Sequence, residues 1–538
     1  MAEVVIDQTP PVLRGPTEKE KKYDRQLRLW AASGQAALES ANILLVNSGA
    51  GTVGVETLKN LVLPGIGKFV IADDAIVDEP DLGINFFLDE TCLERSRAES
   101  CTKLLLELNP EVQGDWFPKN EEKLVLRDFL NSSGPFTLII YTNPITEEDL
   151  ATIEAHASQH KTPVVCAHSA GFYSYFRFSL HGTFPIVDTH PEVDKTTDLR
   201  LLKPWPELSA FAAEMVQGID TLDDHEHGHL PYVVILLHFL EQWRQSNDGK
   251  NPTTLKEKKE FSRLVTSGAR TNNPEGGEEN FQEAVAAINR NIKVSELEKG
   301  LEEVFKHQIT SKIERKSSFW IIARAVSIFY QRHECLPLPG SLPDMKAQSS
   351  VYVKLQSLYK EKARRDAREV LEIVKASASG EHVDQTEVDL FCKNARFVKL
   401  INAKPGGSDL GQIFDAQKAE DEAAEAMKIE TGGAFSPPLS NFFIYLALQA
   451  TAHNPTATAD EIMTAVTKQV LQAAGYDRME QAAQEVARAR GGELHNISAL
   501  TGGMVAQEVI KIITKQYIPV DDTCIFDGIS SRCQVLRL

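Results

Sequence analysis

Three glycines in a short turn constrain the fold of this chain more than any other feature. Gly49, Gly51 and Gly54 form the pattern G-x-G-x-x-G directly after the apolar run 42–47 (NILLVN), and a helix-like stretch follows them. Asp73 ends the next apolar run. In a strand–turn–helix–strand unit, such glycines let the backbone approach a phosphate, the helix N-terminus binds the anion, and the acid takes a ribose hydroxyl. The pattern therefore predicts a nucleotide-binding unit.

The beginning and the end of the chain together predict one α/β domain that is split in the sequence. Apolar runs of strand length alternate with helix-like stretches, which is typical of a parallel, doubly wound sheet. The runs are 42–47, 68–72, 136–141 and 162–167. Amphipathic helical stretches dominate the middle of the chain. We expect a Rossmann-like fold formed by residues 1–170 and 486–538, with a large and mostly α-helical insertion at 171–485.

The C-terminal part contains an apolar helix with two adjacent glycines. Asn496 is its expected N-cap, and two short strands follow the helix. Gly502 and Gly503 lie inside it, where glycine lowers helix stability. We therefore expect both glycines to allow close approach of another backbone.

Charge and cysteine usage exclude several classes of function. The net charge is −19, from 76 acidic and 57 basic residues. A chain this acidic does not suit a nucleic-acid backbone or an anionic membrane surface. The longest apolar run, 231–240 (PYVVILLHFL), is too short to span a bilayer and predicts a buried helix. Seven cysteines without a CxxC pair predict reduced thiols in the cytoplasm or nucleus.

Further motifs complete a resemblance to a known family. Residues 23–30 (YDRQLRLW), 49–73 (GAGTVGVETLKNLVLPGIGKFVIAD) and 495–516 (HNISALTGGMVAQEVIKIITKQ) resemble the adenylation fold of activating enzymes for ubiquitin-like proteins, the ThiF-like superfamily. Residues 336–345 (LPLPGSLPDM) and the helix after them resemble one branch, the regulatory subunits of the Nedd-eight (Rub) activating enzyme. The insertion then resembles the catalytic-cysteine domain, but it lacks the cysteine.

The resemblance also shows which parts of an ATP site are missing. Catalytic members of the family carry a second Asp and an Asn-Arg-Gln run, which fall here on Ala75 and on Gly83, Ile84 and Asn85. Neither a methyl group nor an isoleucine can hold magnesium or phosphate. A lysine that faces the phosphates is replaced by Arg97. We therefore expect Gly49, Gly51, Gly54 and Asp73 to form a vestigial, empty nucleotide loop.

The chain also lacks the residues that the family uses for thioester and zinc chemistry. Cys101-Thr102 is the only Cys-Thr pair, and it lies inside a predicted helix without the Pro that follows the family nucleophile. Cys101 is expected to be a packing residue. We expect no metal on this chain, and ATP, magnesium and structural zinc on a catalytic partner.

Arg25, in the YDRQ block, is the one residue expected to take part in catalysis. In heterodimeric relatives, this arginine of the non-catalytic half contacts ATP bound by the catalytic half, as an arginine finger would. The alternative is a solvated arginine, or one paired with Asp24 or Glu20. The resemblance implies a heterodimer with the catalytic subunit, adenylation and thioester formation of Nedd-eight, and transient contact with its conjugating enzyme for cullin modification.

Two other functions remain as alternatives. The small subunit of the sumoylation activating enzyme shares the YDRQ block but lacks an insertion of this size. An NAD(P)-dependent oxidoreductase would use the G-x-G-x-x-G loop and Asp73, but we find no catalytic His or Lys for it. The run 223–229 (DDHEHGH) is dense in metal-ligand types, but we interpret its alternating histidines as lacking the i, i+4 spacing of a helical zinc pair. We expect a solvated start of a helix there. His168, Ser169 and Ser174 lack a G-x-S-x-G elbow for hydrolase chemistry.

Overall fold

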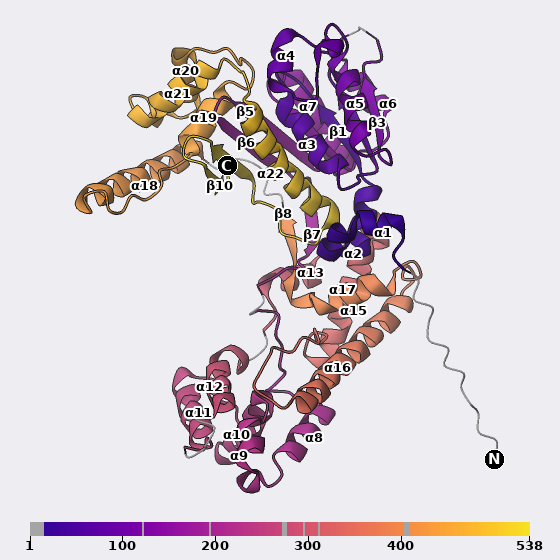
Figure 1. Cartoon of the computed structure of the whole chain (residues 1–538), viewed down its shortest axis with the longest axis vertical. Coiled ribbons are helices and arrows are strands. Elements are labelled where there is room, and N and C mark those ends of the chain that lie inside the picture. The colour runs from indigo at the N-terminus through magenta and orange to yellow at the C-terminus, as the bar shows by residue number, and fades with distance from the viewer. Residues whose placement is uncertain are drawn as a thin grey trace, which may run out of the picture. The chain divides into compact units, whose positions relative to one another are not determined.

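The computed structural model describes residues 15–120, 123–192, 195–271, 277–293, 296–309, 312–402 and 409–538 (Figure 1). The chain divides into two compact units. One comprises Met1–Phe184 and Ile401–Leu538, and we call it the nucleotide-fold unit. The other, Pro185–Leu400, is the insertion unit. Strands β7 (Thr183–Val187) and β8 (Val398–Asn402), which form a two-stranded sheet, carry the chain from one unit into the other.

An eight-stranded mixed sheet forms the centre of the nucleotide-fold unit, in the order β10-β9-β6-β5-β4-β1-β2-β3. The strands from β3 to β5 are parallel, whereas β6, β9 and β10 pair antiparallel. Their bounds are β1 (Asn42–Val46), β2 (Lys68–Ala72), β3 (Gln113–Phe117), β4 (Leu138–Thr142), β5 (Val164–Ala170), β6 (Tyr173–Ser179), β9 (Thr523–Asp527) and β10 (Arg532–Leu536). The parallel part confirms the predicted doubly wound fold.

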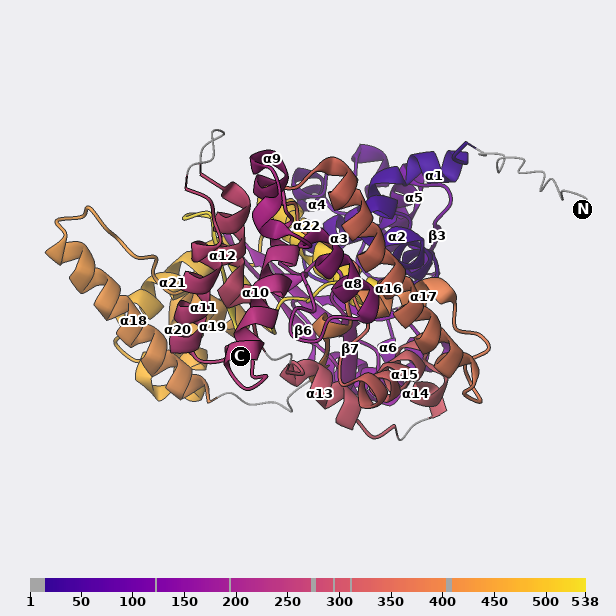
Figure 2. The same cartoon turned by 90° about the horizontal axis from the view of Figure 1, so that it is seen from below.

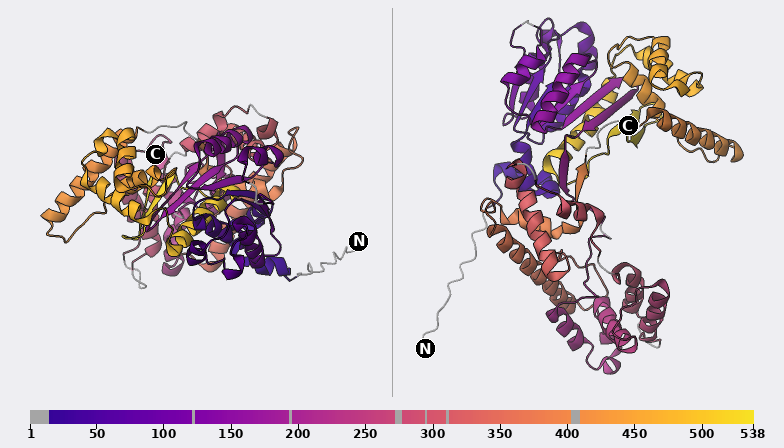
Figure 3. Two further views of the ribbon diagram at one scale, coloured as in Figure 1. Left: turned by 90° about the horizontal axis from the view of Figure 1, so that it is seen from above. Right: turned by 180° about the vertical axis from the view of Figure 1, so that it is seen from behind.

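Helices cover both faces of the parallel strands (Figure 3). In β1, Ile43 and Leu45 face one apolar cluster, whereas Leu44 and Val46 face another. Burial on both faces explains why these strands appear in the sequence as continuous apolar runs. The helices in the first segment of the nucleotide-fold unit are α1 (Glu18–Lys22), α2 (Asp24–Glu39), α3 (Thr52–Val62), α4 (Glu79–Ile84), η1 (Glu90–Cys92), α5 (Arg97–Leu108), α6 (Leu126–Ser132) and α7 (Glu147–His160).

The C-terminal helix α22 (His495–Thr514) packs along α3. A Cβ atom on Gly502 would lie 2.8 Å from the backbone of Glu56, so this glycine permits the close approach that we predicted. The prediction for Gly503 is wrong, because a Cβ there would meet open space. The N-cap prediction is also wrong: the helix begins at His495 and its N-cap is Leu494.

The apolar character of α22 comes from its place in the core. The helix has the length and mean hydropathy, 1.2, of a membrane span, but 61% of that window is buried inside the protein. Val505 and Val509 belong to the same apolar cluster as Ile43 of the sheet. A buried core helix satisfies the same length and composition test as a membrane span.

A helical subdomain that we expected in the insertion belongs instead to the nucleotide-fold unit (Figure 1 and Figure 2). It comprises α18 (Leu410–Glu430), α19 (Phe442–Ala450), α20 (Ala459–Gln469), η5 (Leu471–Ala473) and α21 (Asp477–Ala489). Tyr445 of α19 contacts Tyr175 of β6 with ring centroids 5.0 Å apart, and Ile525 of β9 joins the same apolar cluster. The structural division at residues 184 and 401 therefore differs from the insertion bounds of 171 and 485, because α19 completes the sheet's core.

The insertion unit is mostly helical, as expected. Its helices are α8 (Pro206–Met215), η3 (Ile219–Thr221), α9 (Asp224–Gly228), α10 (Tyr232–Ser246), α11 (Leu255–Ser267), α12 (Glu279–Asn291), α13 (Lys299–Lys306), α14 (Lys312–Lys316), α15 (Ser318–His333), α16 (Ser349–Lys375), α17 (Gln385–Lys393) and η4 (Ala395–Phe397). Helix α10 is buried, as its apolar run predicted. Asp366 of α16 accepts a hydrogen bond from Leu338 N at 3.0 Å, which ties the proline-rich segment to this helix.

Candidate functional site: an internally liganded nucleotide loop

The glycine loop lies between β1 and α3 and has the backbone conformation that its sequence requires. Gly49 and Gly51 adopt φ values of 61° and 63°, a region that favours glycine. A Cβ on Gly49 would lie 2.5 Å from Pro144 Cδ, and one on Gly54 would lie 2.6 Å from Asn47 Oδ1. All three predicted loop glycines are therefore needed for local packing, whether or not a ligand binds.

Asp73, at the end of β2, has no oxygen left for a ribose hydroxyl. Its Oδ2 accepts hydrogen bonds from Asn47 Nδ2 at 2.9 Å and from Arg97 Nε at 2.8 Å. Its Oδ1 accepts from Ala75 N at 2.9 Å and from a terminal nitrogen of Arg97 at 3.2 Å. A ribose would have to displace one of these internal donors, in a site where Asp73 is 2% exposed.

Arg97, the first residue of α5, is buried and binds the glycine loop through its guanidinium group. Its Nη1 donates to the carbonyl of Gly49 at 2.8 Å and contacts Asp81 Oδ1 at 3.1 Å. Burial opposes the guanidinium charge, but the carboxylates of Asp73 and Asp81 outweigh it and raise the pKa of Arg97 above its usual value. The arginine that we expected to retain charge near a phosphate is therefore paired within the protein.

Glu493 lies against the N-terminus of α3, the part of a nucleotide-binding unit where helix amides bind phosphate. This residue lies in the segment between α21 and α22, and its Oε2 accepts a hydrogen bond from Val53 N, in the first turn of α3, at 2.9 Å. Ser498 donates to the same oxygen. Burial raises the pKa of Glu493 to about 7, although these two hydrogen bonds favour the charged form. The helix N-terminus thus already has an internal acceptor.

The positions where the family's magnesium and phosphate ligands fall have structural roles here. Ala75 acts through its backbone, since its carbonyl accepts from Arg97 N at 2.9 Å. Asn85 is buried; its Oδ1 accepts from Phe87 N at 3.2 Å and its Nδ2 lies 3.5 Å from Cys101 Sγ. The residues present therefore do not fit an ATP–magnesium group.

Cys101 is a core residue, as predicted. Its side chain is 1% exposed within α5, and burial raises the pKa of the thiol to about 12. A protonated, inaccessible thiol does not act as a nucleophile.

Arg25 lies on the exposed side of α2 and is available to a partner. The two acids that we considered as its ion-pair partners are engaged elsewhere: Asp24 pairs with Arg28 at 2.9 Å, and Glu20 accepts from Thr17 N at 2.7 Å. Within the described part of the chain, the Arg25 side chain makes no hydrogen bond or ion pair. The alternative of a paired arginine is therefore not observed.

The remaining sequence candidates have no catalytic arrangement. His168 is buried, burial lowers its pKa to about 4, and its Nε2 lies 3.3 Å from Thr451 Oγ1. Ser174 lies 2.6 Å from Thr501 Oγ1 instead. No group of three metal-ligand side chains among His, Cys, Asp and Glu occurs in the described residues.

The histidine-rich run begins a helix, as expected, but two of its details differ from our interpretation. Asp223 caps α9, and the rings of His225 and His229 lie one turn apart, with centroids 4.1 Å apart and planes tilted by 38°. The i, i+4 spacing of a helical histidine pair is therefore present. His227 is buried and its Nδ1 lies 2.7 Å from Glu278 Oε1. This histidine is therefore part of the insertion unit's interior rather than a solvated side chain.

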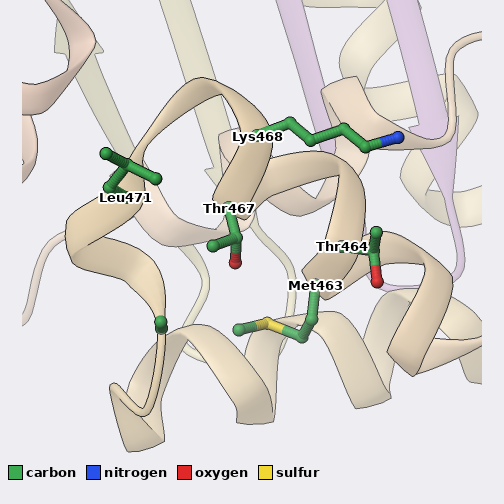
Figure 4. Close-up of a pocket in the computed structure, with 6 residues that line it drawn as sticks. Met463, Thr464, Thr467, Lys468 and Leu471 are labelled. Atoms are coloured by element: carbon green, nitrogen blue, oxygen red, sulfur yellow. The ribbon is translucent and has the colours of Figure 1, made fainter.

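A surface hollow of about 520 Å³ lies beside α20 and η5 (Figure 4). Its lining consists of Met463, Thr464, Thr467, Lys468, Leu471 and Ala474. The one charged side chain, Lys468, has no acid or histidine beside it in this lining. The lining therefore has no pair of titratable side chains.

Two residues of the site were missed from the sequence. Asn47 was taken only as the last residue of a strand, and Glu493 as part of the boundary before the C-terminal helix. Both are polar residues beside apolar elements, which is only a weak signal for a site residue. Residues 47, 73, 97 and 493 are far apart in the sequence and come together only in the folded chain.

The mixed sheet, the glycine loop after β1 and the acid after β2 define a ThiF-type, Rossmann-like protein. The family model described as "ThiF family" matches residues 23–538. The NEDD8-activating enzyme E1 regulatory subunit of Xenopus laevis is 33% identical over 97% of this chain and 99% of its own length. The corresponding AXL subunit of Arabidopsis thaliana is 31% identical over 97% of this chain and 100% of its own length. A crystal structure of E. coli MccB with ATP covers 30% of this chain and 48% of its own, with 15% identity and a TM-score of 0.27. The chain belongs to the ThiF family and, within it, to the NEDD8-activating enzyme E1 regulatory subunits.

Proposed function

We propose that this chain is the non-catalytic half of a heterodimeric activating enzyme for NEDD8 (Nedd-eight, or Rub). The catalytic partner would hold ATP, magnesium and zinc, and would provide the cysteine for the thioester. The pair would adenylate the C-terminus of the modifier and pass it to a conjugating enzyme for attachment to cullins. The proposal also places the chain in the cytoplasm or nucleus, where its seven free thiols remain reduced.

One observation carries the assignment of a non-catalytic role. Arg97 and Asn47 use both oxygens of Asp73, and Glu493 accepts from the first turn of α3, so two of the loop's nucleotide contacts are made internally. The same observation disfavours an NAD(P)-dependent oxidoreductase, which needs Asp73 for ribose. The full-length relatives favour the NEDD8 branch over the sumoylation branch.

Arg25 would be the contribution of this chain to the chemistry. Adenylation expels pyrophosphate, and a guanidinium fixed near the leaving group stabilises its developing charge. The exposed position of Arg25 and the engagement of Asp24 and Glu20 elsewhere support this role.

ATP–pyrophosphate exchange in the presence of NEDD8 tests the proposal. We expect no exchange with this chain alone and exchange once the catalytic subunit is added. Exchange by this chain alone would show that the internal contacts of Asp73 and Glu493 yield to ATP, and would overturn the non-catalytic assignment. Absence of exchange from the reconstituted pair, with a catalytic subunit known to be active, would overturn the heterodimer.

A further inference from the structure

Three sulfur atoms converge on one face of the C-terminal hairpin. Met504 lies on α22, Cys524 on β9 and Cys533 on β10. In the antiparallel register, Cys533 is opposite Phe526 and Val535 is opposite Cys524. Directly opposed side chains share a face, so both thiols lie on the same side of the hairpin. Cys524 belongs to the apolar cluster that α22 helps to form, and Met504 packs against that cluster.

The three sulfurs are close and accessible from one side. Cys533 Sγ lies 3.7 Å from Met504 Sδ, and the Cys533 thiol is near enough to Cys524 to contribute to the raised pKa of the Cys524 thiol. Cys533 is exposed, Met504 is partly buried and Cys524 is buried. A ligand can therefore enter at Cys533 and be held against the two deeper sulfurs.

A disulfide does not fit this geometry. Cys524 and Cys533 are diagonal neighbours, offset by two residues in register. Diagonal Cα atoms lie about 7–8 Å apart, beyond the roughly 4.4–6.8 Å that a disulfide spans. A metal ion does fit, because three sulfurs around one ion at metal–sulfur distances of about 2.3 Å are separated by roughly 4 Å.

We propose that Cys524, Cys533 and Met504 form a three-sulfur site for a soft monovalent cation of the copper(I) type. Two thiolates and a thioether are the ligands that copper(I) prefers, whereas magnesium and calcium prefer oxygen. As each metal–thiolate bond forms, one thiol proton passes to solvent, and no atom changes its oxidation state. The site is independent of the glycine loop and of the proposed activity.

The small number of ligands at this site favours a metal ion with a low coordination number. Among the described residues, no group of three or more His, Cys, Asp or Glu side chains is arranged to hold a metal. Zinc, which takes four protein ligands in structural sites, is therefore disfavoured relative to three-coordinate copper(I).

Anaerobic titration of the full reduced chain with copper(I), in competition with a chromophoric copper(I) chelator, tests the site. We expect one equivalent to be retained, with only sulfur in the first coordination shell by X-ray absorption. The exposed variant Cys533→Ser should weaken retention by about tenfold or more, and Met504→Leu should weaken it by a factor of several. Cys335→Ser, which alters a partly buried cysteine of the insertion unit, is the matched control and should retain the wild-type affinity.

Thermal unfolding provides a second readout. Copper(I) should raise the melting temperature of the wild-type chain and of Cys335→Ser, but not that of Cys533→Ser. Equal copper(I) affinity in wild type and Cys533→Ser, or a first shell containing nitrogen or oxygen, would overturn the proposal.

Discussion

Arg97 Nε lies 2.8 Å from Asp73 Oδ2, and a terminal nitrogen of the same guanidinium lies 3.2 Å from Asp73 Oδ1. Both side chains are buried, at the place where a nucleotide-binding relative would offer a carboxylate to ribose. The pair keeps the glycine loop in its native conformation through the bond from Arg97 to the Gly49 carbonyl. The glycine loop, which binds a ligand in nucleotide-binding proteins, is held here by side chains of the same chain.

Removal of the buried guanidinium should strongly destabilise the nucleotide-fold unit. We expect Arg97→Ala to lower the free energy of unfolding by about 3–5 kcal/mol, because Asp73 and Asp81 would remain buried without a counter-ion. Lys103→Ala, which removes an exposed ion pair with Glu99 on the same helix, should cost less than about 1 kcal/mol. Thermal and urea unfolding of both variants measure the difference. Similar stability of the two variants would contradict a structural role for the Arg97–Asp73 pair.

Glu493 should make stability fall as the pH rises from about 4.5 toward neutrality. Its pKa is raised from 4.5 to about 7 by burial, so the folded state holds a proton that the unfolded state has lost between these values. Stability from this group is complete below about pH 4.5 and declines up to about pH 7, by roughly 3 kcal/mol at most. Glu493→Gln keeps an acceptor for Val53 N and should remove this decline.

The pH dependence is measured as the melting temperature of wild type and Glu493→Gln between pH 5 and 8. The variant's advantage over wild type should grow from pH 5 to about pH 7 and then remain constant up to pH 8. Glu480→Gln, on the exposed side of α21, is the control and should follow wild type. A constant difference between wild type and Glu493→Gln would show that Glu493 titrates in the folded state as it does in the unfolded chain.

The two glycines of α22 should respond oppositely to alanine. Gly502→Ala places a Cβ 2.8 Å from the backbone of Glu56 in α3 and should destabilise by about 1–3 kcal/mol. Gly503→Ala meets open space inside the same helix and should stabilise by about 0.5–1 kcal/mol through helix propensity. Urea unfolding of the two variants compares them directly, and destabilisation by both would mean that α22 and α3 are packed differently.

Arg25→Ala should slow adenylation without dissociating the proposed heterodimer. A positioned cation that stabilises the charge of the leaving group typically contributes about 10²–10³ in rate, or more. Arg28→Ala is the control, since Arg28 lies one turn away on α2 and is paired with Asp24. ATP–pyrophosphate exchange reports the rate and gel filtration reports assembly. An exchange rate for Arg25→Ala equal to that of Arg28→Ala would remove Arg25 from the mechanism.

The sequence was sufficient to predict four of the five parallel strands and the loop, because their signals are local. Continuous apolar runs marked β1, β2, β4 and β5, which are buried on both faces. Strand β3 (QGDWF) was missed, since it lies at the edge of the sheet and is only partly buried. An edge strand needs no continuous apolar pattern, so its pairing with β2 is the only signal that identifies it.

Tertiary structure alone decided the domain boundary and the state of the site. In the sequence, the helices of residues 410–489 cannot be distinguished from those in the rest of the middle of the chain. In the structure they belong to the nucleotide-fold unit, where Tyr445 packs on Tyr175 of the sheet. The residue types at positions 75 and 84 already showed that Ala75 and Ile84 cannot be magnesium or phosphate ligands. That Arg97 and Glu493 replace the ligand was not evident from the sequence, because residues 53 and 493 meet only after the chain has folded across the whole insertion. Local patterns determine elements, whereas contacts between distant residues determine what a site can still bind.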